Sequence, residues 1–193
     1  MKNPIILVTI VSICTIAQTA KSQSGNVDKG FGIWQTFAKA YDKNSYPEID
    51  GRLMNVNWKD LEVAPDVWVW DSLYNELVDK TLNGLPIIIL IYTRDGAPDW
   101  IYDYGVPKVF ESTNNVVTGF SPYYKGTEYK FYFNRMITRV RDYIATLPSN
   151  LRNHVVGIQG CFGSTGDYIA YKGTVDPAYS ISPDGFDSLF HEF

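Results

Sequence analysis

Three short segments of the sequence bring together carboxylates, amides and tryptophans. Each segment follows a run of mostly apolar residues. The residues are Asn57, Trp58, Asp60 and Glu62 in the first segment, Tyr92, Arg94, Asp95, Pro98, Asp99 and Trp100 in the second, and Gln159, Cys161, Ser164, Thr165 and Asp167 in the third. Carboxylates and amides can bind neighbouring hydroxyl groups through paired hydrogen bonds, and an indole ring offers an apolar face for stacking. These residue types favour carbohydrate as the ligand.

The elements that must position these segments follow from the hydrophobic pattern. The pattern predicts strands over 32–37, 53–58, 86–92 and 155–159, and helices over 71–82 and 128–147. Residues 86–92, PIIILIY, form an uninterrupted apolar run, as expected for a strand that is buried on both faces. A long aromatic loop is expected between the third strand and the second helix. Strands that alternate with helices indicate a parallel sheet with right-handed connections.

The order of these elements favours an α/β fold, and specifically a truncated (β/α)8 TIM barrel that holds about the first four βα units. A complete barrel needs about 250 residues, and its functional residues lie where strands end and loops begin. A small doubly wound sheet with a nucleotide ligand is the alternative. The only glycine cluster, over 157–166, matches neither the GxGxxG nor the GK[ST] pattern of a phosphate-binding loop, which disfavours that alternative.

Two tryptophan-containing motifs follow the second and third predicted strands. The first is W-x-x-L-E at 58–62, within NWKDLEVAPDVWVWDSL, and the second is P-x-W at 98–100, within GLPIIILIYTRDGAPDWIY. Together they resemble the front half of clan A glycoside hydrolases, in particular the β-galactosidase and agarase-like members, in which a proline stands where this chain has Val63. The resemblance covers about 32–173. It implies a barrel that hydrolyses the O-glycosidic bonds of a poly- or oligosaccharide by carboxylate acid/base chemistry.

The resemblance also implies which side chains contact the sugar. The expected substrate-binding residues are Arg52, Trp58, Glu62, Arg94, Trp100 and Gln159. Several of them have structural alternatives. Glu62 could instead fix the loop after its motif, Trp58 and Trp100 could pack in the core, and Arg52 could be a surface residue.

The catalytic acid is the point at which this chain departs from the family. The family closes its fourth strand with Asn-Glu, whereas this chain reads VVGIQGCFGSTGD. Either Asp167 supplies the catalytic carboxyl group, or the acid is lost and Gln159 only hydrogen-bonds the substrate. In the family the nucleophile comes from a seventh strand, so we expect the chain alone to show little or no hydrolase activity. The alternative function is a non-catalytic carbohydrate-binding protein with a degenerate barrel site.

Composition narrows the choice of cofactor and partner. The formal net charge is −4 and the pI is about 5.1, with no block of Lys or Arg, which argues against a nucleic-acid partner. Two histidines and two cysteines cannot build a closed zinc site of the Cys/His type. We expect no metal and no cofactor, because general acid/base and nucleophilic work by carboxylates needs neither.

The two ends of the chain carry separate expectations. Residues 1–22 resemble a signal peptide, with Lys2, an apolar stretch over 5–16 and a small-x-small site at 20–22, which predicts a secreted or periplasmic protein without a membrane span after cleavage. An uncleaved anchor is the alternative. Residues 23–193 would be the barrel domain. A helix that begins at Pro183 and carries an apolar stripe up to Phe193 suggests a truncated chain.

Overall fold

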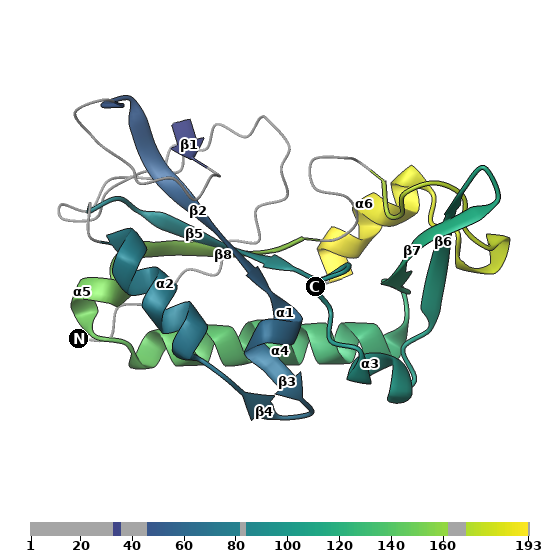
Figure 1. Cartoon of the computed structure of the whole chain (residues 1–193), viewed down its shortest axis with the longest axis horizontal. Coiled ribbons are helices and arrows are strands. Elements are labelled where there is room, and N and C mark those ends of the chain that lie inside the picture. The colour runs from purple at the N-terminus through teal and green to yellow at the C-terminus, as the bar shows by residue number, and fades with distance from the viewer. Residues whose placement is uncertain (1–32, 36–45, 82–83, 162–168, 193) are drawn as a thin grey trace.

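The computed structural model describes residues 33–35, 46–81, 84–161 and 169–192, and its centre is a four-stranded parallel sheet (Figure 1). The strands are β1 (Ile33–Gln35), β2 (Ile49–Asn57), β5 (Ile87–Tyr92) and β8 (Val155–Cys161), in the order β1-β2-β5-β8. All three pairings are parallel. The four predicted strands are therefore present, the first of them over the described residues 33–35 alone, and their parallel direction is confirmed.

The main helices lie close to the predicted ranges. They are α2 (Asp71–Thr81) and the long α4 (Thr127–Thr146), followed by the short α5 (Ser149–Arg152). Figure 1 shows α4 running along one side of the sheet. The Phe133 ring of α4 packs on Gly160 of β8, where a Cβ would come within 2.8 Å of the ring. The buried core lies in this layer and includes Met54, Ile89, Ile158, Met136 and Val140.

The expected half of a TIM barrel is wrong. The described residues form a small mixed α/β fold, in which the parallel sheet has β1 and β8 as its outer strands. Two small antiparallel sheets accompany it, β3 (Glu62–Ala64) with β4 (Val67–Trp68), and β6 (Lys108–Thr113) with β7 (Val116–Pro122). Alternation of strands and helices determines that strands run parallel. The two antiparallel hairpins, one inserted between β2 and β5 and the other between β5 and β8, do not follow from that alternation.

The segment expected to be an aromatic loop is also structured. The short helix α1 (Trp58–Leu61) directly follows β2. After β5, where the loop was expected, the chain forms α3 (Trp100–Asp103) and the β6–β7 hairpin. Thr113 pairs with Val116, which leaves a two-residue loop, and both loop residues have positive φ, 52° at Asn114 and 62° at Asn115. These angles are those of a type I′ turn, whose twist matches that of the two strands and which asparagine tolerates well.

The C-terminal part packs against this hairpin and the core. Thr174 exchanges two backbone hydrogen bonds of 2.8 Å with Ser112 of β6. After the short 3-10 helix η1 (Pro177–Tyr179), α6 (Pro183–Glu192) begins as predicted, with the Ser182 hydroxyl accepting from the Gly185 N–H at 3.1 Å. Phe186 and Leu189 of α6 are buried. Among the helices described, none has the length and apolar character needed to cross a membrane.

Candidate functional site

A polar cleft lies at the carboxyl ends of β2 and β5, closed on one side by the β6–β7 hairpin. Figure 1 shows this hairpin beyond the ends of the parallel strands, next to α3 and α6. The cleft has a volume of about 280 Å³. Its lining residues are Lys59, Arg94, Asp95, Ala97, Asp99, Thr118, Gly119 and Phe120. Three separate parts of the chain thus supply its charged groups, its hydroxyl and its aromatic ring.

An ion pair attaches the hairpin to the end of β5. The Arg94 guanidinium donates from Nε to Oε1 of Glu111 at 3.1 Å, and its Nη2 pairs with Oε2. The Ser121 hydroxyl also donates to Glu111, whose side chain is fully buried. The hydrogen bond to Glu111 is the main cause that raises the pKa of Arg94 above its usual value. Arg94 therefore stays charged and holds the hairpin at the cleft.

The loops after β2 and β5 are joined at the floor of the cleft. Lys59 donates from Nζ to the Asp95 carbonyl at 2.9 Å and from its backbone N–H to the Gly96 carbonyl at 2.8 Å. The loop after β5 turns so tightly that a Cβ at Gly96 would lie only 2.5 Å from the Tyr92 carbonyl oxygen. Only glycine fits at this position without a shift of the backbone. The side chains of Asp95 and Asp99 remain exposed at this edge.

The Trp58 and Glu62 side chains of the W-x-x-L-E motif lie inside the protein and do not line the cleft, whereas Lys59 of the same motif does. Trp58 and Glu62 are fully buried, and the Trp58 Nε1–H donates to the Glu62 carboxylate at 2.9 Å. Glu62 also accepts from the Asp66 N–H at 3.0 Å and pairs with Arg135 of α4. Burial raises the pKa of Glu62, and these hydrogen bonds partly offset that effect. Glu62 thus takes its structural alternative and fixes the loop after α1, out of reach of a ligand.

Trp100, the tryptophan of the second motif, packs beside this buried group. Its Nε1–H donates to the Glu62 carbonyl oxygen at 3.2 Å, and its ring meets the Trp58 ring edge-on at 6.3 Å. The Arg135 guanidinium lies 5.4 Å from the centre of the Trp100 ring. Trp100 is half-buried and does not line the cleft. The predicted substrate contacts at Trp58, Glu62 and Trp100 therefore form part of the core and its rim.

The remaining predicted site residues are dispersed. Arg94 lines the cleft. Arg52 is buried on β2, opposite the first residue of β5, and so lies away from the carboxyl ends of the strands. Gln159 sits on β8 opposite Leu90 and is half-buried, outside the cleft lining. Asp167, the predicted catalytic acid, lies outside the described residues.

Several residues of the cleft were not singled out by the sequence. Lys59, Thr118, Phe120 and the supporting Glu111 were missed, because the segment that holds three of them was expected to be a loop. One signal could have found them. Asn114-Asn115 stands between two runs with strand-like residues, KVFEST and VVTGFSP, which is a hairpin pattern.

The described part of the chain holds no cluster of three or more His, Cys, Asp or Glu side chains that could bind a metal ion. Cys161, at the end of β8, is buried, and burial raises the pKa of its thiol to about 12. The thiol is therefore protonated near neutral pH and a poor nucleophile.

The cleft offers carboxylate, ammonium and guanidinium groups as its chemically active side chains.

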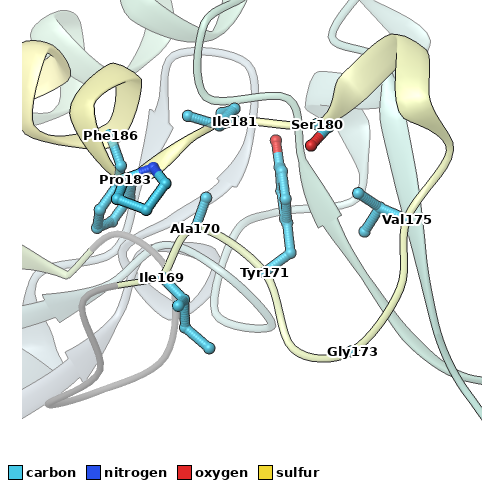
Figure 2. Close-up of a pocket in the computed structure, with 9 residues that line it drawn as sticks. All are labelled: Ile169, Ala170, Tyr171, Gly173, Val175, Ser180, Ile181, Pro183 and Phe186. Atoms are coloured by element: carbon cyan, nitrogen blue, oxygen red, sulfur yellow. The ribbon is translucent and has the colours of Figure 1, made fainter.

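A second cavity, of about 150 Å³, lies between 169–175 and the start of α6 (Figure 2). Its walls are mostly apolar, with side chains from Ile169, Val175, Ile181, Pro183 and Phe186. Figure 2 shows the Tyr171 hydroxyl pointing toward the segment that carries Ser180 and Ile181. Few polar groups converge there, so the larger polar cleft is the better candidate for a functional site.

No known protein-family model matches this sequence, and no curated protein matches it either.

Proposed function

We propose that this protein binds a poly- or oligosaccharide in the cleft between the loops after β2 and β5 and the β6–β7 hairpin. The observation that carries the proposal is the lining of this one cleft. The carboxylates of Asp95 and Asp99 accept hydrogen bonds from sugar hydroxyls, the Lys59 ammonium donates them, and the Phe120 ring offers an apolar face to the C–H side of a sugar ring.

The charge of the cleft favours a neutral sugar. Lys59 and Arg94 are balanced by Asp95 and Asp99, and Arg94 is in addition paired with Glu111 behind the cleft wall. An anionic ligand such as a phosphate ester or a sulfated glycan would meet two exposed carboxylates without a surplus of positive charge. We therefore expect binding to depend only weakly on salt concentration, because exposed ionic contacts are the ones that salt screens.

The test is calorimetric titration of the protein with neutral oligosaccharides prepared from agarose, cellulose and xylan. We expect one series to bind, and we expect Asp99→Asn to weaken that binding about tenfold, because a hydrogen bond to a charged group is worth about 1.5–3 kcal/mol. Asp99 makes no side-chain cap to α3, so the substitution should leave the fold intact.

Asp103→Asn is the matched control, since Asp103 is an exposed aspartate of α3 that does not line the cleft. It should bind like the natural chain. If none of the three series binds, or if the two variants weaken binding equally, the cleft is not the sugar site.

Glycoside hydrolysis is the second candidate, favoured by the presence of two exposed carboxylates in one cleft. Hydrolysis needs a pair of carboxyl groups, one of which acts as an acid. The assay is the release of reducing ends from the same saccharides by the natural chain and by Asp95→Asn, Asp99→Asn and Asp167→Asn. Activity that disappears in two of these variants identifies the pair. A chain that binds sugar without releasing reducing ends is a binding protein.

We also propose that the protein is exported, because 1–22 has the pattern of a signal peptide. A mature N-terminus near residue 23 in exported material, found by N-terminal sequencing, would support this proposal. A cell-retained protein that keeps Met1 would oppose it.

A further inference from the structure

The outer face of the β6–β7 hairpin carries an aromatic surface that is continuous with the cleft. Phe110 and Phe120 are directly opposite each other in the hairpin register, with ring centres 6.4 Å apart. Phe120 lines the cleft, and Phe110, which is 56% exposed, lies on the same face of the hairpin, because residues directly opposite each other in an antiparallel pair share a face. A ligand that rests on Phe120 is therefore next to the exposed ring of Phe110.

Two further side chains hold this surface in place. The Tyr102 ring of α3 meets Phe120 edge-on at 5.7 Å. The Lys108 ammonium lies 4.5 Å from the centre of the Tyr102 ring and 4.2 Å from that of Phe120. A cation held over aromatic rings is stabilised by their π electrons, and its N–H groups remain able to donate to a ligand. The surface thus combines apolar faces with a hydrogen-bond donor, as the cleft does.

The exposure of Phe110 is not explained by the needs of the fold. The opposite face of the hairpin is the one that packs inward, with Val109, Glu111 and Ser121 all buried. Phe110 adjoins Phe120, which in turn meets Tyr102, and adjoining aromatic rings of this kind mark an interaction surface where a single exposed ring does not.

We infer that the surface formed by Lys108, Phe110 and Phe120 of the hairpin, with Tyr102 of α3, is a second sugar position, and that the ligand is a chain of several sugar units running from the cleft over the hairpin. This inference rests on the function proposed above and adds the length and direction of the ligand. The occupant is the continuing chain of the same neutral saccharide, because the two surfaces share Phe120.

The test compares a disaccharide with a hexasaccharide from the agarose, cellulose and xylan series, titrated into the natural chain and into Phe110→Ala. We expect the natural chain to prefer the hexasaccharide. The variant should lose about fivefold in affinity for the hexasaccharide and keep its affinity for the disaccharide, since only the longer ligand reaches the aromatic ring that is removed.

Two further variants serve as controls for this test. Phe131→Ala removes a phenylalanine of α4 that is 61% exposed and should leave both affinities unchanged. Phe110→Tyr keeps a ring for stacking and should bind the hexasaccharide like the natural chain. A hexasaccharide affinity that Phe110→Ala does not change overturns the inference and leaves the proposed function standing. A natural chain that binds no saccharide overturns both.

Discussion

Two buried glutamates, Glu62 and Glu111, each hold an arginine from a distant part of the chain. Glu62 pairs with Arg135, 73 residues later, and thereby ties the loop after α1 to α4. Glu111 pairs with Arg94 and ties the hairpin to β5. A buried carboxylate is costly unless it is paired and hydrogen-bonded, and both of these side chains are. The Glu111 pair therefore holds the hairpin at the cleft, and the Glu62 pair holds the loop after α1 on α4.

We predict that Glu111→Gln destabilises the protein by about 3 kcal/mol, because removal of one partner of a buried ion pair leaves the other without compensation. The value lies at the low end of the usual range because the Arg94 side chain retains 18% exposure. The free energy of unfolding in urea is the measurement. Glu128→Gln, at an exposed position of α4, should change it by less than about 0.5 kcal/mol. If Glu111→Gln and Glu128→Gln lower the free energy of unfolding equally, the Arg94–Glu111 ion pair contributes little to stability.

At the scale of the element, the β6–β7 hairpin is the part that makes the cleft. It contributes Thr118, Gly119 and Phe120 to the lining and Glu111 to the support of Arg94. The strands on either side of it were predicted closely because their apolar runs are long. The hairpin was missed because its outer face is partly apolar, so the alternation of inward and outward side chains is blurred by Phe110, Val116 and Val117.

The turn of this hairpin should be sensitive to residue type. Asn115 has a φ of 62°, a conformation that is costly for a β-branched side chain. We predict that Asn115→Val destabilises the protein by about 1–2 kcal/mol and increases hydrogen exchange at the hairpin amides. Thr113→Val is the control, because the same side chain is placed there in extended backbone of β6. If exchange at the hairpin rises as much in the control, the turn conformation is not the cause.

At the scale of the whole molecule, the sheet and α4 form two layers whose spacing depends on small residues. Gly160 of β8 faces the Phe133 ring, so a methyl group there would force the ring to move. Gly157 of the same strand is nearest to Ile88 Cγ1, at a hypothetical Cβ distance of 3.7 Å, which is an ordinary contact. The two glycines therefore offer a matched comparison of tight and loose positions.

We predict that Gly160→Ala destabilises the protein by about 1–3 kcal/mol, the usual cost of overpacking a core. Gly157→Ala should be close to neutral. Thermal unfolding of the two variants beside the natural chain checks this prediction. A Gly160→Ala protein as stable as the Gly157→Ala protein would mean that the Phe133 ring moves aside freely, and that the layer is less tightly packed than the structure shows.

The sequence by itself determined the strands β2, β5 and β8, the helices α2 and α4, and the start of α6 at Ser182. Each of these depends on local periodicity or on a capping residue within one turn. It also singled out Arg94, Asp95 and Asp99 at the end of β5, because residues at the carboxyl ends of parallel strands share one edge of the sheet.

Only the tertiary structure decided that antiparallel hairpins stand between the parallel strands, that Trp58 and Glu62 are buried, and that the β6–β7 hairpin completes the cleft. These outcomes depend on contacts between residues far apart in the chain, such as Glu62 with Arg135. The free energy of such a contact depends on burial and geometry that exist only once the elements have packed. Local patterns carry no record of that packing, so the W-x-x-L-E motif indicated a surface site where the folded chain has a buried ion pair.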